Sequence, residues 1–277
     1  MKKLILGAVS LLLSASLVGC GTSAKNDTAG STTDGGNKVV TLKVGASPVP
    51  HEEILKAIAP QLEKEGVKLD IVTFNDYVQP NLKLADGTLD ANFFQHVPYQ
   101  DSFAKEHKLD LTALTPVHVE PIGGYSKKYK NVNDLPDGAS IALPNDVTNE
   151  GRVLALLDKK GLIKLKDGVG ISGTLKDITE NKKNFKFKEL EAAMLPRVLP
   201  EVDLAMINTN YALEAKLVPT KDALIIEDKD SPYANVLTVN TKDKDNEALK
   251  KLAKALNSPE AKKFIEDKYQ GSIIPAF

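Results

Sequence analysis

The chain has 277 residues and a formal net charge of −1, with 36 basic side chains against 37 acidic ones. This balance lacks the basic excess of a nucleic-acid binder, so no nucleic-acid partner is expected. The length suits one large domain or two small ones with apolar cores. The single cysteine precludes a disulfide within one chain, so those cores must hold the fold.

The N-terminus has the parts of a secretory signal. Two lysines precede an apolar stretch at residues 4–13, which is too short to span a bilayer. The run LVGC at 17–20 then resembles the bacterial lipobox, which implies a signal peptide over 1–19 and a lipid on Cys20. The alternative is an ordinary signal peptide or an apolar helix with a chance cysteine. The expected location is the extracytoplasmic side of the cell membrane, on a Gram-positive surface or in a periplasm.

Residues 20–38 are expected to form a lipidated, flexible tether. Residues 21–38 contain no apolar side chain larger than alanine, and such a segment cannot offset the entropy of ordering. A linker of this composition spans roughly 20 to 25 Å. It would hold a folded body just off the membrane.

The first part of the folded body alternates strands and helices. Ile54, Leu55, Ile58 and Leu62 recur at helical spacing until Gly66, and Pro60 predicts a kink. Strands are expected at Val39–Gly45, Leu69–Phe74 and Ala91–Phe94, and further helices at 78–86 and 98–107.

Two extended stretches, 116–126 and 231–240, are expected to cross between lobes because they interrupt this alternation. Between them we expect strands at Ser140–Leu143, Leu204–Ile207 and Leu224–Glu227, and helices at Asn149–Lys160 and 189–199. Amphipathic helices at 245–256 and 259–268 should return to the first lobe.

The order of elements predicts an α/β fold with two mainly parallel sheets. The expected lobes are 39–122 with 234–277, and 123–233. Two crossovers between two lobes make a hinge, and a hinge makes a cleft.

Aromatic residues gather near two predicted strand ends, in the runs FNDY (74–77) and FFQHVPY (93–99). Strand ends of open α/β sheets face the ligand crevice, so Tyr77, Phe94, His96 and Tyr99 are candidates for one wall of a slot. Aromatic faces suit an apolar or thioether group. The alternative is a place in the core, which is favoured for Phe74, Phe93 and Phe103.

Arg152 is a candidate receptor for a carboxylate. It lies one turn into a helix for which Thr148 is the expected N-cap, and a helix start favours anions. Only two arginines occur in the chain, Arg152 and Arg197, and a guanidinium fork permits two-point recognition. A surface arginine is the competing interpretation.

Three asparagines are further candidates, Asn149 and Asn208 at junctions between a strand and a helix and Asn235 on the second crossover. Asn149, Asn208 and Asn235 offer acceptors and donors that can divide an ammonium and a carboxylate between them. Helix capping is an equal alternative for Asn208 and Asn210.

Catalytic and metal-binding patterns are poorly represented. There is no thiol beyond Cys20, no GxSxG elbow and no complete dinucleotide loop. The four histidines lack the spacing of a metal site. No enzymatic activity, cofactor or metal is expected, and a monomer is expected because no coiled coil is apparent.

Seven segments together resemble the methionine-binding lipoprotein family of the MetQ/NlpA type, the substrate-binding proteins of ABC importers. They are FNDYVQPN (74–81), DANFFQHVPY (90–99), GYSKK (124–128), PNDVTNEGR (144–152), GLIKLKDGVG (161–170), INTNYA (207–212) and SPYAN (231–235).

The resemblance implies a two-lobed periplasmic-binding-protein-like fold of type II that delivers one amino acid to a permease and its ATPase. It implies that Tyr77, Phe94, His96 and Tyr99 wall a thioether side chain and that Arg152 binds the carboxylate. Asn149, Asn208 and Asn235 would complete the polar contacts. L-Methionine is the expected ligand, with D-methionine or a methionine-containing dipeptide as alternatives within the family. A surface hydrolase or an adhesin lipoprotein is the alternative outside it.

Overall fold

The computed structural model describes residues 39–228 and 231–277. By internal contacts the chain separates into Met1–Gly36 and Asn37–Phe277, and the described residues belong to the second unit. The expected signal peptide, the expected lipidation site Cys20 and the expected tether lie outside the described residues. Those assignments stay predictions.

The first sheet has six strands in the order β13-β4-β12-β3-β1-β2. β1 pairs in parallel with β2 and β3, whereas β12 runs antiparallel to β3 and β4, and β13 antiparallel to β4. The strands are β1 Val40–Ala46, β2 Val67–Thr73, β3 Ala91–His96, β4 Leu111–Val119, β12 Ala234–Asn240 and β13 Ile274–Pro275. We call this sheet and its helices the first lobe.

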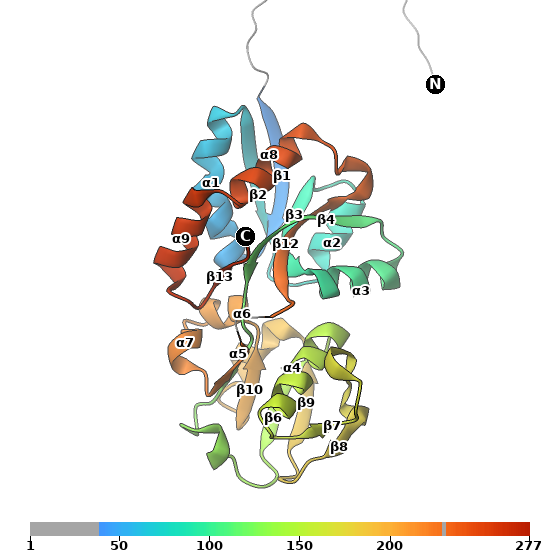
Figure 1. The fold of residues 1–277 in the computed structure, drawn as a ribbon, viewed down its shortest axis with the longest axis vertical. Coiled ribbons are helices and arrows are strands. Elements are labelled where there is room, and N and C mark those ends of the chain that lie inside the picture. The colour runs from blue at the N-terminus through green and yellow to red at the C-terminus, as the bar shows by residue number, and fades with distance from the viewer. Residues whose placement is uncertain (1–38, 229–230) are drawn as a thin grey trace, which may run out of the picture. The chain divides into compact units, whose positions relative to one another are not determined.

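Helices cover both faces of the first sheet (Figure 1). They are α1 Glu53–Lys64, α2 Gln79–Ala85, α3 Val97–His107, α8 Glu247–Leu256 and α9 Pro259–Tyr269. Phe93 packs among residues of α1, α8 and α9, whereas Phe94 packs with Tyr99 and Phe103 of α3. Successive strand side chains point to opposite faces, so β3 is buried on both sides.

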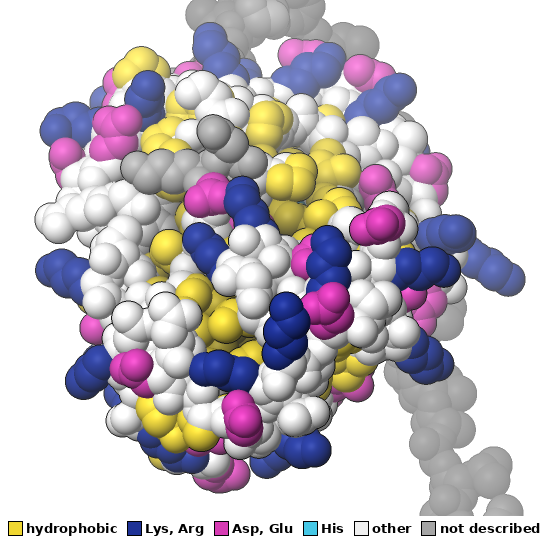
Figure 2. Space-filling view, turned by 60° about the horizontal axis from the view of Figure 1, so that its bottom comes forward, with side chains coloured by type: hydrophobic (Ala, Val, Ile, Leu, Met, Phe, Trp, Pro, Cys, Tyr) yellow, Lys and Arg dark blue, Asp and Glu magenta, His cyan; other side chains and the backbone are white. Residues whose placement is uncertain are grey.

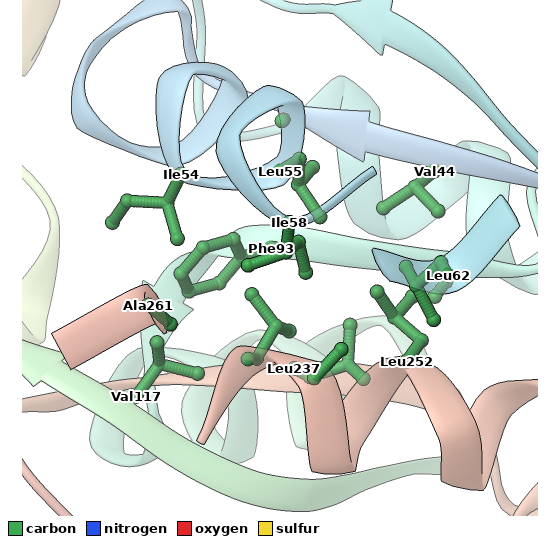
Figure 3. Close-up of a cluster of buried hydrophobic side chains, with 14 of the residues drawn as sticks. Val44, Ile54, Leu55, Ile58, Leu62, Phe93, Val117, Leu237, Leu252 and Ala261 are labelled. Carbon is green, nitrogen blue, oxygen red and sulfur yellow. The ribbon is translucent and has the colours of Figure 1, made fainter. Parts of the chain in front are cut away.

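The core of the first lobe joins the two ends of the described chain. Ile54 and Leu55 of α1 are fully buried, and they pack in one cluster with Leu237 of β12 and Leu252 of α8 (Figure 3). Burial of one such side chain contributes about 1.5–3 kcal/mol. The C-terminal helices therefore complete a core that the N-terminal strands begin.

The second sheet has five strands in the order β11-β5-β10-β6-β9. They are β5 Gly123–Tyr125, β6 Ser140–Pro144, β9 Lys186–Leu190, β10 Leu204–Ile207 and β11 Ile225–Ile226. The helices α4 Val147–Lys159, α5 Leu195–Val198, α6 Thr209–Glu214 and α7 Pro219–Asp222 accompany them. α4 packs on one face through Val153 and Leu154, and α5 on the other through Leu195. This is the second lobe.

Short elements complete the chain. β7 Lys164–Leu165 and β8 Ile178–Glu180 form a separate antiparallel pair. A π-type turn, η1 Pro48–Glu52, precedes α1. Single 3-10 turns are η2 Val132–Asp134, η3 Gly170–Ser172, η4 Leu175–Asp177, η5 Ala192–Met194 and η6 Thr241–Asp243.

Two sheets, each with its own helices, confirm the expected two-lobed α/β fold, but the strand directions need a correction. The sheets are mixed and not mainly parallel, because β12 and β11 both run antiparallel to their neighbours. The chain leaves the first lobe along β4 and re-enters it along β12, and these two strands pair in opposite directions. The crossovers themselves thus supply antiparallel pairs.

The helix expected at 189–199 is also wrong in part. Lys186–Leu190 forms an edge strand parallel to β6, and only Leu195–Val198 is α-helical. Edge strands carry many charged residues, so the lysine-rich run KFKEL lacks the apolar character that marks a central strand.

The exposed surface carries both signs of charge. Figure 2 shows lysine or arginine side chains interspersed with aspartate or glutamate on one face, without a field of a single sign there. Within 39–228 and 231–277, no helix has the length and apolar content that a membrane span requires.

Candidate ligand-binding site

A pocket lined by residues of both lobes lies between them. All eight ligand-binding residues expected from the sequence line it. The full lining is Tyr77, Phe94, Gln95, His96, Tyr99, Glu120, Asn149, Arg152, Asn208, Thr209, Asn210 and Asn235. The structure thus brings the predicted segments together at one cavity, whose lining also includes four residues that the sequence analysis did not place there: Gln95, Glu120, Thr209 and Asn210.

Most of the lining comes from the end of a strand or the start of a helix, whereas Tyr77 lies in a loop, Glu120 in a crossover and Asn235 at the beginning of β12. Phe94 and His96 lie on β3, and Tyr99 follows at the start of α3. Asn208 lies directly after β10, where it precedes α6. Carboxyl ends of strands meet at the crevice of an open α/β sheet, which explains why these distant segments converge.

Three rings form an aromatic wall on the first-lobe side. The centroid of Tyr77 lies 5.9 Å from that of Phe94 and 5.8 Å from that of Tyr99. Tyr99 Oη donates to the carbonyl of Tyr77 at 2.9 Å, which fixes the two rings together. Phe93 and Phe103 lie in the cores, as expected.

The N-cap of α4 is Asp146 and not the expected Thr148. Its carboxylate accepts from the backbone N–H of Asn149 at 3.0 Å, and α4 begins two residues earlier than predicted. The same carboxylate accepts from Asn149 Nδ2 at 3.1 and 3.0 Å. Aspartate is a strong N-cap, and the Thr148 hydroxyl instead donates to it.

This carboxylate sets the direction of a chain of hydrogen bonds. Because an ionised carboxylate only accepts, Asn149 turns Nδ2 towards Asp146 and Oδ1 away. Asn149 Oδ1 lies 3.2 Å from His96 Nε2 and accepts from Asn208 Nδ2 at 3.0 Å. His96 Nδ1 accepts from the backbone of Tyr99, so His96 is the neutral tautomer that carries its proton on Nε2.

Two polar atoms in the lining remain without a partner among the described residues. They are Asn208 Oδ1, an acceptor, and Asn210 Nδ2, a donor. The hydrogen bonds of the other amide atoms fix these assignments, since Asn208 Nδ2 donates to Asn149 and Asn210 Oδ1 accepts from Tyr77. Leaving buried polar groups unpaired is costly, so the cavity is prepared for a polar guest.

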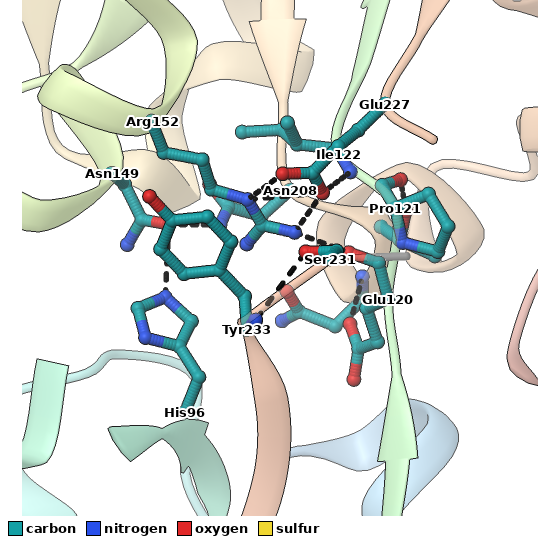
Figure 4. A network of polar contacts seen from close by, with 12 residues as sticks. His96, Glu120, Pro121, Ile122, Asn149, Arg152, Asn208, Glu227, Ser231 and Tyr233 are labelled. Carbon is teal, nitrogen blue, oxygen red and sulfur yellow. Dashed lines mark hydrogen bonds and ion pairs between the residues drawn. The ribbon is translucent and has the colours of Figure 1, made fainter. Parts of the chain in front are cut away.

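Arg152 is buried and strongly held (Figure 4). Its Nε lies 3.1 and 3.2 Å from the two carboxylate oxygens of Glu227, and its Nη2 bonds to Glu227 and to the carbonyl oxygen of Glu120. The ring of Tyr233 stacks 4.2 Å from its Cζ. The fork expected to receive a ligand carboxylate thus already engages a carboxylate of the protein.

Glu120 is the second charged residue of the lining, and it lies in the crossover between β4 and β5. Oε1 lies 2.8 Å from His118 Nε2 and 3.2 Å from His51 Nε2, and Oε2 accepts from the backbone of Asn210 at 3.0 Å. Burial raises the pKa of its carboxyl group, while attraction by His51 and Arg152 opposes that rise.

The three side chains His51, His118 and Glu120 offer ligand atoms within 4.8 Å of one another, as a metal site would. A metal-bound histidine donates its second ring N–H to an acceptor. Here Nδ1 of both histidines lacks a partner among the described residues. Burial lowers the pKa of His51 to about 4 and that of His118 to about 3, so both are neutral near pH 7. The geometry fits His118 Nε2–H as a donor to Glu120, whereas His51 Nε2 lies 3.0 Å from Asn235 Oδ1 and shares its proton between that amide oxygen and Glu120.

Glu120 had a weak signal in the sequence. His118 and Glu120 alternate with valines in the run VHVE, and they share one face of an extended segment. A carboxylate and an imidazole on the buried face of a strand need partners, which singles them out.

Two α/β lobes that enclose a cavity lined by one buried guanidinium and one buried carboxyl group define a two-lobed binding protein. The model of the NlpA lipoprotein family matches residues 42–277. The chain belongs to the NlpA lipoprotein family, which confirms the resemblance found in the sequence.

Named relatives agree with this. The methionine-binding lipoprotein MetQ of Bacillus subtilis (strain 168) is 41% identical over 280 residues, which cover 99% of each chain. The D-methionine-binding lipoprotein MetQ of Escherichia coli (strain K12) is 43% identical over 269 residues, which cover 96% of this chain and 94% of that protein.

A similar solved structure is a nutrient binding protein from Burkholderia cenocepacia bound to methionine. It is 50% identical, with a TM-score of 0.83, and the match covers 85% of this chain and 100% of that one. The similarity extends over both lobes and supports the type II two-lobed fold.

Proposed function

We propose that this protein is a lipid-anchored, extracytoplasmic solute-binding protein that captures free methionine for an ABC importer. The observation behind this proposal is the lining of one cavity by Arg152, Glu120 and three aromatic rings. Opposite charges suit a zwitterion, and aromatic faces suit a thioether. The 50% identical protein from Burkholderia cenocepacia is described as bound to methionine.

The polar atoms of the cavity suggest how the zwitterion lies. We assign the ligand carboxylate to Arg152 and the unpaired Nδ2 of Asn210, because both are donors. We assign the ammonium to Glu120 and the unpaired Oδ1 of Asn208, because both are acceptors. Asn149 orients Asn208 and His96, and Asn235 Oδ1 lies 3.0 Å from His51 Nε2, so these two asparagines shape the polar end.

The side chain of the ligand is assigned to the wall of Tyr77, Phe94, Tyr99 and the neutral ring of His96. This wall favours linear apolar or sulfur-containing chains. It contains no counter-charge that an aspartate or lysine side chain would need, since Glu120 and Arg152 are assigned to the main-chain groups of the ligand.

Calorimetry on the purified protein tests this function with L-methionine, D-methionine, a methionine-containing dipeptide, aspartate and lysine. We expect L-methionine to bind more tightly than the two charged amino acids. The Escherichia coli relative is named a D-methionine-binding lipoprotein. Tighter binding of D-methionine than of L-methionine would identify D-methionine as the ligand. Preference for aspartate or lysine would contradict the proposal.

The proposal includes delivery to a membrane permease with its ATPase, a lipid on Cys20, a monomeric state and no enzymatic activity. A relative from Coxiella burnetii is described as a periplasmic substrate-binding protein of an ABC transporter. Intact mass of the mature protein from cells tests the lipid. Substitution of Cys20 by serine should release the protein from the membrane fraction.

A further inference from the structure

Two residues outside the cavity lining hold the arginine that we assign to the ligand carboxylate. Glu227 follows β11 and Tyr233 precedes β12, so both lie near the second crossover. The side chain of Arg152 is only 2% exposed and that of Glu227 only 14%. A pair that is withdrawn from water to this degree is fixed more firmly than a surface ion pair.

The contacts use most of the hydrogen-bonding capacity of the guanidinium. It has one N–H on Nε and two on each terminal nitrogen. Nε donates to Glu227, and Nη2 donates to Glu227 and to the carbonyl of Glu120. None of these bonds uses Nη1. Within the described residues, Nη1 is therefore the nitrogen left for a guest.

The contacts also fix the plane of the group. Tyr233 covers one face of the guanidinium, and its ring meets the ring of His96 with centroids 4.9 Å apart. Glu227 is in turn anchored to the other crossover: its N–H donates to the carbonyl of Ile122 at 3.0 Å, and its Oε2 lies 3.4 Å from the N–H of Ile122.

We propose that Glu227 and Tyr233 are positioning residues for Arg152. They hold its guanidinium so that, of its three nitrogens, only Nη1 contacts the carboxylate of the ligand. The inference rests on the proposed function. Glu227 acts in two opposing ways: it orients the guanidinium, and it neutralises part of its charge. If the orienting effect dominates, removal of Glu227 weakens binding of the ligand. If Glu227 only neutralises charge, its removal strengthens binding.

The test compares L-methionine with L-methioninamide, which keeps the ammonium and the side chain but lacks the carboxylate. For Glu227→Ala we expect calorimetry to give about tenfold to hundredfold weaker binding of L-methionine. Binding of the amide should change little, so the preference for the carboxylate should fall. Glu227→Gln, which keeps the shape and one acceptor, should lie between Glu227→Ala and the wild type.

Tyr233 offers a matched pair of variants. Its hydroxyl has no partner among the described residues, so Tyr233→Phe, which keeps the ring face, should keep the preference for L-methionine over the amide. Tyr233→Leu removes the ring face and should lower the preference for L-methionine over the amide. Equal losses for both ligands in Glu227→Gln and Tyr233→Leu, or tighter binding of L-methionine, would overturn the proposal.

A measurement without ligand separates this inference from the proposed function. The chain has two arginines, so NMR of [15N]arginine-labelled protein gives two Nε–H signals, and Arg197→Lys identifies that of Arg152. We expect slow solvent exchange at Arg152 in the wild type and fast exchange in Glu227→Gln. Fast exchange already in the wild type overturns the positioning role. Slow exchange with no methionine binding by the wild type overturns the proposed function alone.

Discussion

Tyr77 of the first lobe donates a hydrogen bond to Asn210 of the second lobe, with 2.6 Å between Tyr77 Oη and Asn210 Oδ1. The bond crosses the cavity and leaves Nδ2 of the same amide as the unpaired donor in the lining. One tyrosine hydroxyl therefore both joins the lobes and determines which end of Asn210 faces a guest.

Removal of this hydroxyl should weaken ligand binding, but it should not change which amino-acid side chain the protein prefers. In Tyr77→Phe the ring stays, and the lost bond is worth about 0.5–1.5 kcal/mol. We expect a matching loss of methionine affinity by calorimetry. Tyr125→Phe is the control, because the hydroxyl of Tyr125 is buried without a partner among the described residues. Equal affinities for Tyr77→Phe and the wild type would show that the bond does not contribute.

Substitution of Arg152 should cost more. We expect Arg152→Ala to lose roughly 2 to 5 kcal/mol of methionine binding, because a buried charge partner is removed and Glu227 is left unpaired. Arg152→Lys should not restore binding, since an ammonium cannot bond to Glu227 and Glu120 in the geometry of the fork. Arg197→Ala is the control at an exposed arginine. Unchanged affinity in folded Arg152→Ala would remove this residue from the site.

Acid should destabilise the protein through His96. Burial and repulsion by Arg152 lower its pKa from 6.5 to about 3. The unfolded chain therefore takes up a proton at a higher pH than the folded chain. The free energy of unfolding should fall as the pH drops from about 6.5 towards 3, by up to about 1.4 kcal/mol per pH unit for this one group.

Urea denaturation at pH 7, 6 and 5 measures this dependence. His51 and His118 contribute in the same direction, and the raised pKa of Glu120 offsets part of it. His96→Gln keeps an N–H donor towards Asn149 and should reduce the slope. A slope that is the same in this variant and in the wild type would contradict a buried, neutral His96.

Gly151 limits what α4 can accommodate. A Cβ atom at this position would lie 2.1 Å from the backbone carbonyl oxygen of Ile171, which cannot swing aside as a side chain would. Gly→Ala in an unobstructed helix gains about 1 kcal/mol, so the sign of the effect is diagnostic. We expect Gly151→Ala to destabilise the protein by about 1–3 kcal/mol in thermal or urea unfolding. Stabilisation would show that the loop moves freely.

The sequence was informative about the site where regular elements end. Asn149 and Arg152 at a helix start, and Phe94 and His96 at the end of a buried strand, follow from periodicity and from the geometry of open sheets. Glu120 was missed because it lies in an extended crossover, where no periodicity distinguishes a cavity residue from a linker. The partnership of Arg152 with Glu227 depends on residues 75 positions apart, and spacing along the chain does not reveal it.

Local sequence patterns also predicted only part of the fold. The run 204–207 was predicted with its observed bounds because it is apolar throughout and fully buried. The edge strand 186–190 was not predicted, and the helix expected at 189–199 overlapped its last two residues, because pairing with β6, and not its own composition, makes it a strand.

Asp146 acts on the guest from a distance. Because the Asp146 carboxylate accepts hydrogen bonds and donates none, Asn149 must turn Nδ2 towards it and Oδ1 towards Asn208. Asn208 then donates through Nδ2, and its Oδ1 is the acceptor that faces the cavity. An amide at position 146 would allow either orientation, and the wall would then present a donor as readily as an acceptor. The sign of the ligand group tolerated beside Asn208 is therefore encoded in a side chain that does not line the cavity.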